Sequence, residues 1–305
     1  MVPSAVTVEP VSSPANAAVR LLGLYLELGK ARLSLLVVLT AAVGFAVAPA
    51  TGFDGPGFLW VTLGTFLLAL GANGLNQWQE SERDARMDRT AGRPLPSARM
   101  KPAHAFVASL VAVAGGVLVC AAGNNALTAA LGAANVAIYV LAYTPLKPVT
   151  PLNTLVGAIC GAIPPMMGWA AATGGLAPGA YVLGAVLFVW QIPHSLALAF
   201  MYREDYARGG YRMLPNVDGD GRLTFHVVNL HCLALVPVAL LATPLGIAGA
   251  WFAAGAVGLG TVMVVFGVVL WRRRRVQDAR RLFLATLLYL PLLLGLMVLD
   301  RGPLN

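Results

Sequence analysis

Residues 57–95 read GFLWVTLGTFLLALGANGLNQWQESERDARMDRTAGRPL, and this stretch decides the fold class. Its first half, residues 57–77, is an apolar run without a charged residue, and acids and arginines follow directly. A helix needs roughly 20 such residues to cross a bilayer core of about 30 Å. Across all 305 residues only 11% are charged, against about 25% in soluble domains. We therefore predict an all-α membrane protein.

Apolar runs of helical length recur along the whole chain. They lie at residues 31–49, 57–77, 103–122, 125–144, 152–172, 177–200, 224–245, 247–270 and 281–299. The strands of a membrane barrel would be shorter and would alternate in polarity, which these runs do not. The sequence thus predicts nine transmembrane helices around a central cavity.

Basic residues lie almost entirely on one side of this arrangement. With a cytoplasmic N-terminus, every lysine and arginine except Arg301 falls in an inner segment, as is typical of membrane proteins. The net charge of +8 therefore indicates membrane orientation, with the C-terminus outside, and no nucleic-acid partner. Residues 1–20 lack the basic start and apolar core of a secretory signal. We expect a disordered cytoplasmic tail there, one polytopic domain over residues 21–305, and a bacterial plasma membrane as the location.

Three oxygen-bearing side chains recur every four residues at the end of the second run, namely Asn76, Glu80 and Asp84. If the helix continues, they lie on one face, one turn above another. Carboxylates stacked in this way repel each other, and Mg²⁺ relieves the repulsion at oxygen sites that it shares with substrate phosphates. The alternative is a solvated helix end in which the acids pair with Arg83 and Arg86.

Further polar residues follow the acidic row and the later runs. Arg89 and Arg93 carry planar guanidinium groups that suit phosphate oxygens. The charge of Lys147 suits a diphosphate leaving group, although inner-loop charge explains it equally well. Asp205 is the best second carboxylate for a metal. His194 lies within an apolar run, where polar side chains usually face a cavity; it can contact a substrate, act as a base, ligate iron or have a structural role.

Three blocks of the sequence resemble the UbiA-type intramembrane prenyltransferases. They are Asn76–Leu95; Tyr143–Lys147 with Asn153 and Gly161–Trp169; and Trp190–His194 with Arg203–Pro215. Within that family, His194 and its surroundings are similar to the branch that prenylates haem. Glu80 stands where many relatives have aspartate, and the third block offers one firm carboxylate, Asp205, rather than a spaced pair.

The resemblance implies a role for each matched residue. It implies catalytic roles for Asn76, Glu80, Asp84, Lys147, His194 and Asp205. It implies Mg²⁺ as the cofactor, with Asn76, Glu80, Asp84 and Asp205 as its ligands. It implies substrate binding by Arg89, Arg93, Tyr143, Asn153, Arg203 and Arg208.

The implied reaction transfers the farnesyl group of farnesyl diphosphate to a vinyl group of haem B. Water adds in the same reaction, and the products are haem O and diphosphate. Both substrates meet in the lipid bilayer with the site toward the cytoplasm, and a haem A synthase is the partner implied. One alternative is a prenyltransferase acting on a quinone or chlorophyll precursor. A membrane transporter is the other, although transporters place ionisable sites near the midplane.

Overall fold

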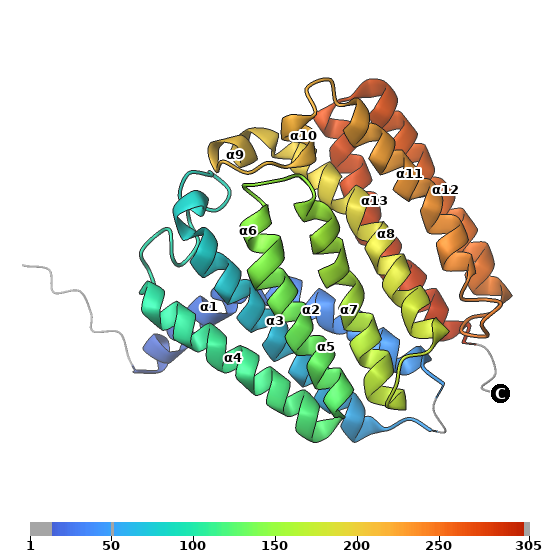
Figure 1. The fold of residues 1–305 in the computed structure, drawn as a ribbon, viewed down its shortest axis with the longest axis horizontal. Helices are drawn as coiled ribbons and strands as arrows, with labels where there is room; N and C mark the ends of the chain where they lie inside the picture. The colour runs from blue at the N-terminus through green and yellow to red at the C-terminus, as the bar shows by residue number, and fades with distance from the viewer. Residues whose placement is uncertain (1–13, 50–51, 302–305) are drawn as a thin grey trace, which may run out of the picture.

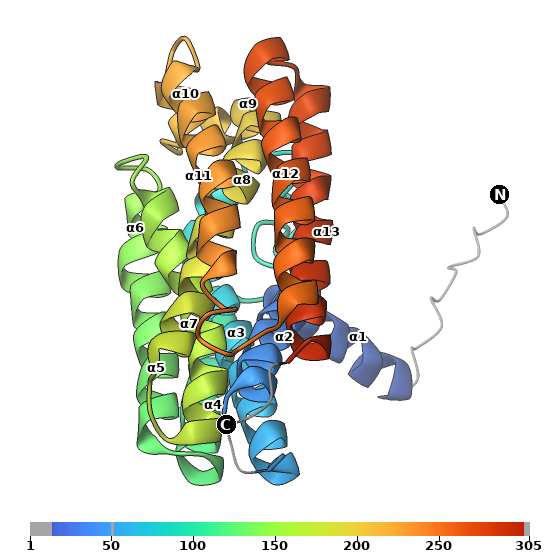
Figure 2. The same cartoon turned by 90° about the vertical axis from the view of Figure 1, so that its right-hand side faces the viewer.

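Helices make up the regular structure of the described residues, apart from an isolated bridge between Ala248 and Arg301. The computed structural model describes residues 14–49 and 52–301 (Figure 1). In chain order the helices are α1 (Pro14–Leu28), α2 (Ala31–Val47), α3 (Gly55–Asp84), α4 (Pro102–Gly123), α5 (Ala126–Ala137), the π-helix η1 (Ile138–Tyr143), α6 (Thr144–Leu146), α7 (Asn153–Thr173), α8 (Pro178–Met201), α9 (Arg203–Arg208), α10 (Leu214–Val217), α11 (Arg222–Leu240), α12 (Ala250–Arg273) and α13 (Val276–Leu299). The long helices run side by side as a bundle (Figures 1 and 2).

The predicted all-α, multi-span architecture is confirmed. In the described part of the chain, eight helices are long and apolar enough to cross a membrane. The number is nine if α1 and α2, which meet at a bend of 61°, form one span. The first predicted run counts as a span only together with α1, because α2 alone has 17 residues. The central cavity and the orientation of the termini stay predictions.

Helix α1 projects from the side of the bundle (Figure 2). It begins at Pro14, so residues 14–20 of the expected tail are helical. The rest of that tail, residues 1–13, lies outside the described residues. α1 therefore extends the ordered part of the chain beyond the first predicted run.

Helix α3 is long enough to carry both an apolar span and the polar row. Its N-cap residue Asp54 accepts a hydrogen bond from the Gly57 amide at 3.0 Å. The helix then continues for 30 residues to Asp84. At about 1.5 Å per residue it exceeds a bilayer core of about 30 Å. The row of three therefore lies on one helix face as predicted. Asp88, which continues the four-residue spacing, lies beyond the helix end and is exposed.

The fourth predicted run, residues 125–144, is not one regular helix. Its last part is the π-helix η1, which is followed by the short α6. The Thr144 hydroxyl donates to the Tyr139 carbonyl at 2.8 Å across this wide turn. π-Helical turns occur frequently at functional sites, and this one leads directly to Lys147.

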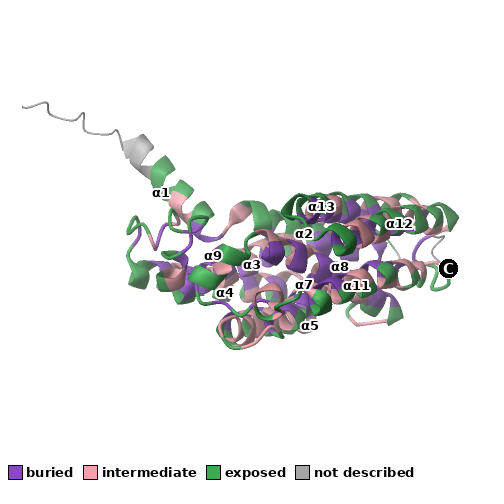
Figure 3. Cartoon of the chain, turned by 90° about the horizontal axis from the view of Figure 1, so that it is seen from above, coloured by how far each residue is buried: buried purple, intermediate pink, exposed green. Residues whose placement is uncertain are grey.

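Helix α7 packs on α2 and α5 and also on α8. It therefore connects α2 and α5 with α8, which in turn packs on α11 and α13. A Cβ at Gly168 would lie 1.8 Å from the Ala41 carbonyl oxygen, and one at Gly44 would lie 2.0 Å from that of Pro165. Glycine at these two positions allows α2 and α7 to cross closely, as small residues do between membrane helices. Buried residues gather between the helices and exposed residues cover the outside (Figure 3). Large apolar side chains on that outer surface include Trp251, which is 80% exposed and suits a lipid environment.

Candidate active site

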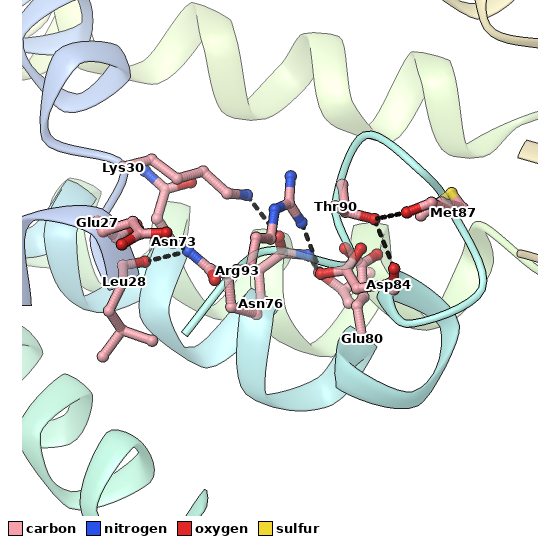
Figure 4. Close-up of polar contacts among 12 residues, drawn as sticks. Glu27, Leu28, Lys30, Asn73, Asn76, Glu80, Asp84, Met87, Thr90 and Arg93 are labelled. Atoms are coloured by element: carbon pink, nitrogen blue, oxygen red, sulfur yellow. Dashed lines mark hydrogen bonds and ion pairs between the residues drawn. The ribbon is translucent and has the colours of Figure 1, made fainter. Parts of the chain in front are cut away.

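The three oxygen-bearing side chains at the end of α3 are all buried. Asn76 is 0% exposed, Glu80 5% and Asp84 1%. Glu80 Oε1 lies 2.8 Å from Lys147 Nζ, and Asp84 Oδ2 lies 2.6 Å from an Arg93 guanidinium nitrogen (Figure 4 shows the latter pair). A cluster of buried acids and cations therefore forms where α3 ends.

The alternative of a solvated helix end is wrong. Glu80 and Asp84 are buried, and neither forms an ion pair with Arg83 or Arg86 among the described residues. Arg83 instead donates to the Gly209 carbonyl oxygen at 3.1 Å. Arg83 thus joins the end of α3 to the segment that follows α9.

Lys147 is held as a cation by its surroundings. Burial would lower the pKa of the Lys147 ammonium, but the Glu80 carboxylate raises it well above the ordinary value. The ammonium also lies 4.6 Å from the centroid of the Tyr143 ring. Removing one partner of a buried pair usually costs about 3–5 kcal/mol, because the other charge stays buried alone.

The orientation of the Asn76 amide follows from its neighbours. Lys30 Nζ, which can only donate, lies 2.9 Å from Asn76 Oδ1 (Figure 4). Asn76 Nδ2 donates to Thr144 Oγ1 at 3.1 Å, and that hydroxyl in turn donates to the Tyr139 carbonyl oxygen. The amide oxygen therefore faces the cations, and the amide nitrogen faces the π-helical turn.

The second acidic region, on α9, lies against the segment that follows α3. The guanidinium group of Arg208 pairs with Asp205 on α9 and with Asp88, at 2.6 Å, beyond the end of α3. The Arg89 guanidinium lies 5.7 Å from the centroid of the Tyr206 ring. The structure therefore brings together the two acidic regions, which are more than a hundred residues apart in the sequence.

Two of the predicted substrate-binding residues, Arg203 and Asn153, do not contact the carboxylates of the α3 cluster in the described part of the chain. Arg203 is exposed, with its guanidinium 5.4 Å from the centroid of the Phe200 ring, and no ion pair joins it to the acidic cluster among the described residues. Asn153 is buried and donates to the carbonyl oxygens of Thr150 at 2.6 Å and Arg212 at 3.4 Å. Since the Arg212 amide in turn donates to the Lys147 carbonyl at 2.8 Å, Asn153 helps to position Lys147.

His194 lies in an aromatic stack between α8 and α13. Its ring is stacked on Trp190 at 4.7 Å and on Phe283 at 4.8 Å, centroid to centroid. His194 Nδ1 lies 2.8 Å from the Thr286 hydroxyl, which donates its own proton to the Phe283 carbonyl at 2.6 Å. Thr286 Oγ1 must therefore accept, so Nδ1 carries the proton. Nε2 is left with a lone pair and no protein partner among the described residues.

The donor chemistry of the α3 cluster fits a hard cation, although the carboxylates are paired with basic side chains. No group of three His, Cys, Asp or Glu side chains is close enough to hold a metal ion in residues 14–49 and 52–301. Mg²⁺, however, is usually bound by one or two carboxylates together with substrate phosphates and water. The buried amide and carboxylate oxygens of α3 meet that smaller requirement.

Sequence reasoning missed three residues that belong to these sites. Lys30 was counted only as inner-side charge, yet it contacts Asn76. Tyr211 is buried against the cluster, where burial and the Glu80 carboxylate raise the pKa of its hydroxyl. Thr286, on the last helix, orients His194. No signal in the sequence marks Thr286, but the position of Lys30 just before an apolar run could have pointed to the membrane face.

Residues 37–290 match the model of the UbiA prenyltransferase family. The match covers well over half of the chain, so this protein belongs to the UbiA prenyltransferase family.

The similar curated proteins include several protoheme IX farnesyltransferases. The Solibacter usitatus protein is 42% identical over 286 residues, which is 91% of this chain and 98% of that protein. The Anaeromyxobacter protein is 45% identical over 269 residues, which is 88% of this chain and 90% of that protein. The mitochondrial protein of Arabidopsis thaliana is 40% identical over 278 residues, and this chain spans 64% of its length.

Solved structures share the fold at low sequence identity. A digeranylgeranylglyceryl phosphate synthase superimposes with a TM-score of 0.77 at 16% identity, covering 92% of this chain and 98% of that chain. A UbiA homologue from Archaeoglobus fulgidus, bound to GPP and Mg²⁺, gives a TM-score of 0.67 at 15% identity, covering 90% and 99%. At these identities the structures show the common fold.

Proposed function

We propose that this protein transfers the farnesyl group of farnesyl diphosphate to a vinyl group of haem B. Water adds to the vinyl group, haem O forms and diphosphate leaves. The proposal is supported by the protoheme IX farnesyltransferase of Solibacter usitatus, which matches this chain over 98% of its own length. The observation that carries the chemistry is the cluster at the end of α3, where the buried carboxylates of Glu80 and Asp84 pair with Lys147 and Arg93.

The proposed site residues divide between a metal and the substrates. Asn76, Glu80 and Asp84 would hold Mg²⁺ from α3, and Asp205 would approach from α9. When bound, Mg²⁺ neutralises part of the diphosphate charge. The proposed substrate contacts are Arg89, Arg93, Tyr143, Asn153, Arg203 and Arg208. Of these, Arg203 would have to leave its place over the Phe200 ring to reach the substrate.

The basic residues of the cluster stabilise charge that grows on the leaving group. Lys147 and Arg93 now neutralise carboxylates, and the same donors suit diphosphate oxygens. Positioned cations of this kind stabilise a transition state because they need not reorganise during the reaction. The apolar bundle on the other side of the cluster keeps water from the allylic cation that forms as the carbon–oxygen bond breaks.

The His194 stack is the proposed site for the haem acceptor. Its aromatic rings offer an apolar surface, and the free Nε2 of His194 offers a lone pair to iron or to a proton. We further propose a bacterial plasma membrane with the site toward the cytoplasm, supported by the one-sided distribution of basic residues. The family resemblance leads us to expect that a haem A synthase receives the product.

The test is direct. Purified protein in lipid is incubated with haem B, farnesyl diphosphate and Mg²⁺, and the haem fraction is examined by mass spectrometry for the farnesylated, hydrated product. We expect haem O to form and chelation of Mg²⁺ with EDTA to stop its formation. Prenylation of an aromatic quinone precursor, with haem B unchanged, would contradict this function and support the sister activity.

A further inference from the structure

Lys30 lies at the corner between α1 and α2 and reaches into the α3 cluster (Figure 4). Its side chain is half-buried, and its ammonium contacts Asn76 Oδ1 at 2.9 Å. The other two cations of the cluster, Lys147 and Arg93, each pair with a carboxylate. Within residues 14–49 and 52–301, Lys30 forms no such pair. Its acceptor is a neutral amide.

The cluster therefore holds more basic groups than acidic ones. Three basic side chains, Lys30, Lys147 and Arg93, face two carboxylates, Glu80 and Asp84. A charge removed from water is costly unless it is paired. The unpaired ammonium makes the cluster suited to an anionic ligand, and a diphosphate group brings several charged oxygens to the same place.

The backbone at Lys30 is held in an unfavourable conformation. Its φ is 49°, in the left-handed region that L-residues other than glycine, asparagine and aspartate seldom adopt. The other non-glycine residues with positive φ in the described chain, Ala98 and Arg274, are exposed. Such strain persists where the surrounding structure enforces it, and it is concentrated at functional sites. The strained corner directs the Lys30 side chain toward α3.

The corner does not need the Lys30 side chain as an anchor. Gln77 Nε2 donates to two carbonyl oxygens in the last turn of α1, at 2.6 and 3.0 Å. The Ser34 hydroxyl donates to the Gly29 carbonyl at 2.9 Å, and Asn73 Nδ2 donates to the Ser34 hydroxyl at 3.2 Å. These neutral hydrogen bonds already fix the corner on α3, which leaves the ammonium for a ligand.

We propose that Lys30 is a substrate-binding residue whose ammonium donates to the diphosphate oxygens of the prenyl substrate. It exchanges Asn76 Oδ1 for those oxygens when the substrate binds. The inference rests on the proposed function, since it requires a prenyl diphosphate as the substrate. It adds the α1–α2 corner, which precedes all three sequence blocks, to the elements that form the site.

The experiment compares Lys30→Met with the matched control Arg32→Met, which removes an exposed charge two residues away. Calorimetry measures the binding of inorganic diphosphate in the presence of Mg²⁺, and kinetics measure KM for each substrate. We expect Lys30→Met to weaken diphosphate binding and raise KM for farnesyl diphosphate about ten- to a hundredfold, as for a lost charged hydrogen bond. KM for haem B should stay constant, Lys30→Arg should recover most of the affinity, and Arg32→Met should behave as wild type.

A second variant separates binding from a structural role. Gln77→Met loosens the corner but keeps the ammonium, so we expect a lower Tm and a smaller loss of diphosphate affinity than in Lys30→Met. Equal losses of diphosphate affinity in Gln77→Met and Lys30→Met would overturn the proposal, as would wild-type binding by Lys30→Met.

Measurements on the wild-type protein distinguish failure of the proposed haem function from failure of the proposed role of Lys30. If it binds diphosphate but forms no haem O, the haem function fails and the role of Lys30 stands. If it binds no diphosphate, both fail.

Discussion

The two acidic regions of this molecule are built in opposite ways. The first lies on α3, a helix of 30 residues, where the oxygen-bearing side chains are buried and both carboxylates pair with half-buried cations. The second lies on α9, a helix of six residues whose Glu204 and Arg208 are exposed. Arg208 and Arg89 connect α9 to the end of α3 through surface contacts. The comparison indicates a fixed half of the site on α3 and a weakly held half on α9.

The largest effect is expected from the fixed half. Glu80→Gln keeps the size of the side chain and removes the charge that pairs with Lys147. We expect turnover to fall by about two to three orders of magnitude or more, as when a preorganised charged group is lost from a site. Stability should also fall, by about 3–5 kcal/mol at most, because Lys147 stays buried without a partner. Turnover is measured per folded protein, by the rate of diphosphate release.

The matched control for this change is Glu82→Gln. Glu82 lies on the same helix two residues further on and is exposed. Its charge should have little effect on turnover or Tm, because exposed charges contribute little. Full turnover in Glu80→Gln would contradict the assignment of α3 as the metal and diphosphate site.

A smaller effect is expected from the weakly held half. Asp205→Asn removes the one buried carboxylate of α9, and Glu204→Gln removes its exposed neighbour. We expect Asp205→Asn to raise KM for farnesyl diphosphate roughly tenfold, as for one charge-assisted contact, and to change kcat less than Glu80→Gln does. Steady-state kinetics at varied Mg²⁺ measure both constants. A loss as large as that of Glu80→Gln would show that the two halves are equivalent and would break the comparison.

The next change tests the contact between the halves. Arg208→Met removes the bridge from Asp205 to Asp88. Hydrogen exchange should become faster over residues 203–211, while the amides of α3 keep their protection. The cost in stability should be about 1 kcal/mol or less, since the Arg208 side chain is 49% exposed. Unchanged exchange over residues 203–211 would mean that other contacts hold α9.

The smallest effect on turnover is expected from an acidic residue outside both regions. Donation by the Thr224 N–H and hydroxyl outweighs the effect of burial and lowers the pKa of Asp218 below its ordinary value. A lowered folded-state pKa stabilises the fold above the unfolded pKa of about 4, and the contribution is lost as pH falls below that. Asp218→Ala should therefore cost about 1 kcal/mol at pH 7. The difference in Tm from wild type should shrink below about pH 4, and turnover should stay unchanged. A constant difference in Tm across that range would contradict this role for Asp218.

The sequence predicted the spans and the α3 row because both depend on regular periods. Apolar length fixes a spanning helix, and a four-residue spacing places Asn76, Glu80 and Asp84 on one helix face. The Asp218-Gly-Asp220-Gly segment, which resembles a calcium loop at first sight, forms a turn at the start of α11. The acid–cation pairs were not predictable, since Lys147 and Arg93 reach α3 through tertiary packing.

Other features escaped prediction because no local pattern encodes them. The corner at Lys30 depends on α3 side chains that hold strained backbone in place, and the orientation of His194 depends on Thr286, 92 residues later. The ion pair between Arg208 and Asp88 similarly joins segments that are distant in the sequence. Spacing and composition describe one element at a time, whereas these contacts are made between elements.

The π-helical turn η1 allows the chain to lose one residue without a change in the facing of the helices on either side. A π-turn holds one residue more than an α-turn. Deleting one residue from Ile138–Tyr143 can therefore close the segment as ordinary α-helix while the helices on either side keep their facing. Lys147 would then still approach Glu80, but the Tyr139 carbonyl would lose the geometry that connects it through Thr144 to Asn76. Deleting one residue here would therefore alter the contacts of Asn76 and spare the pair between Lys147 and Glu80.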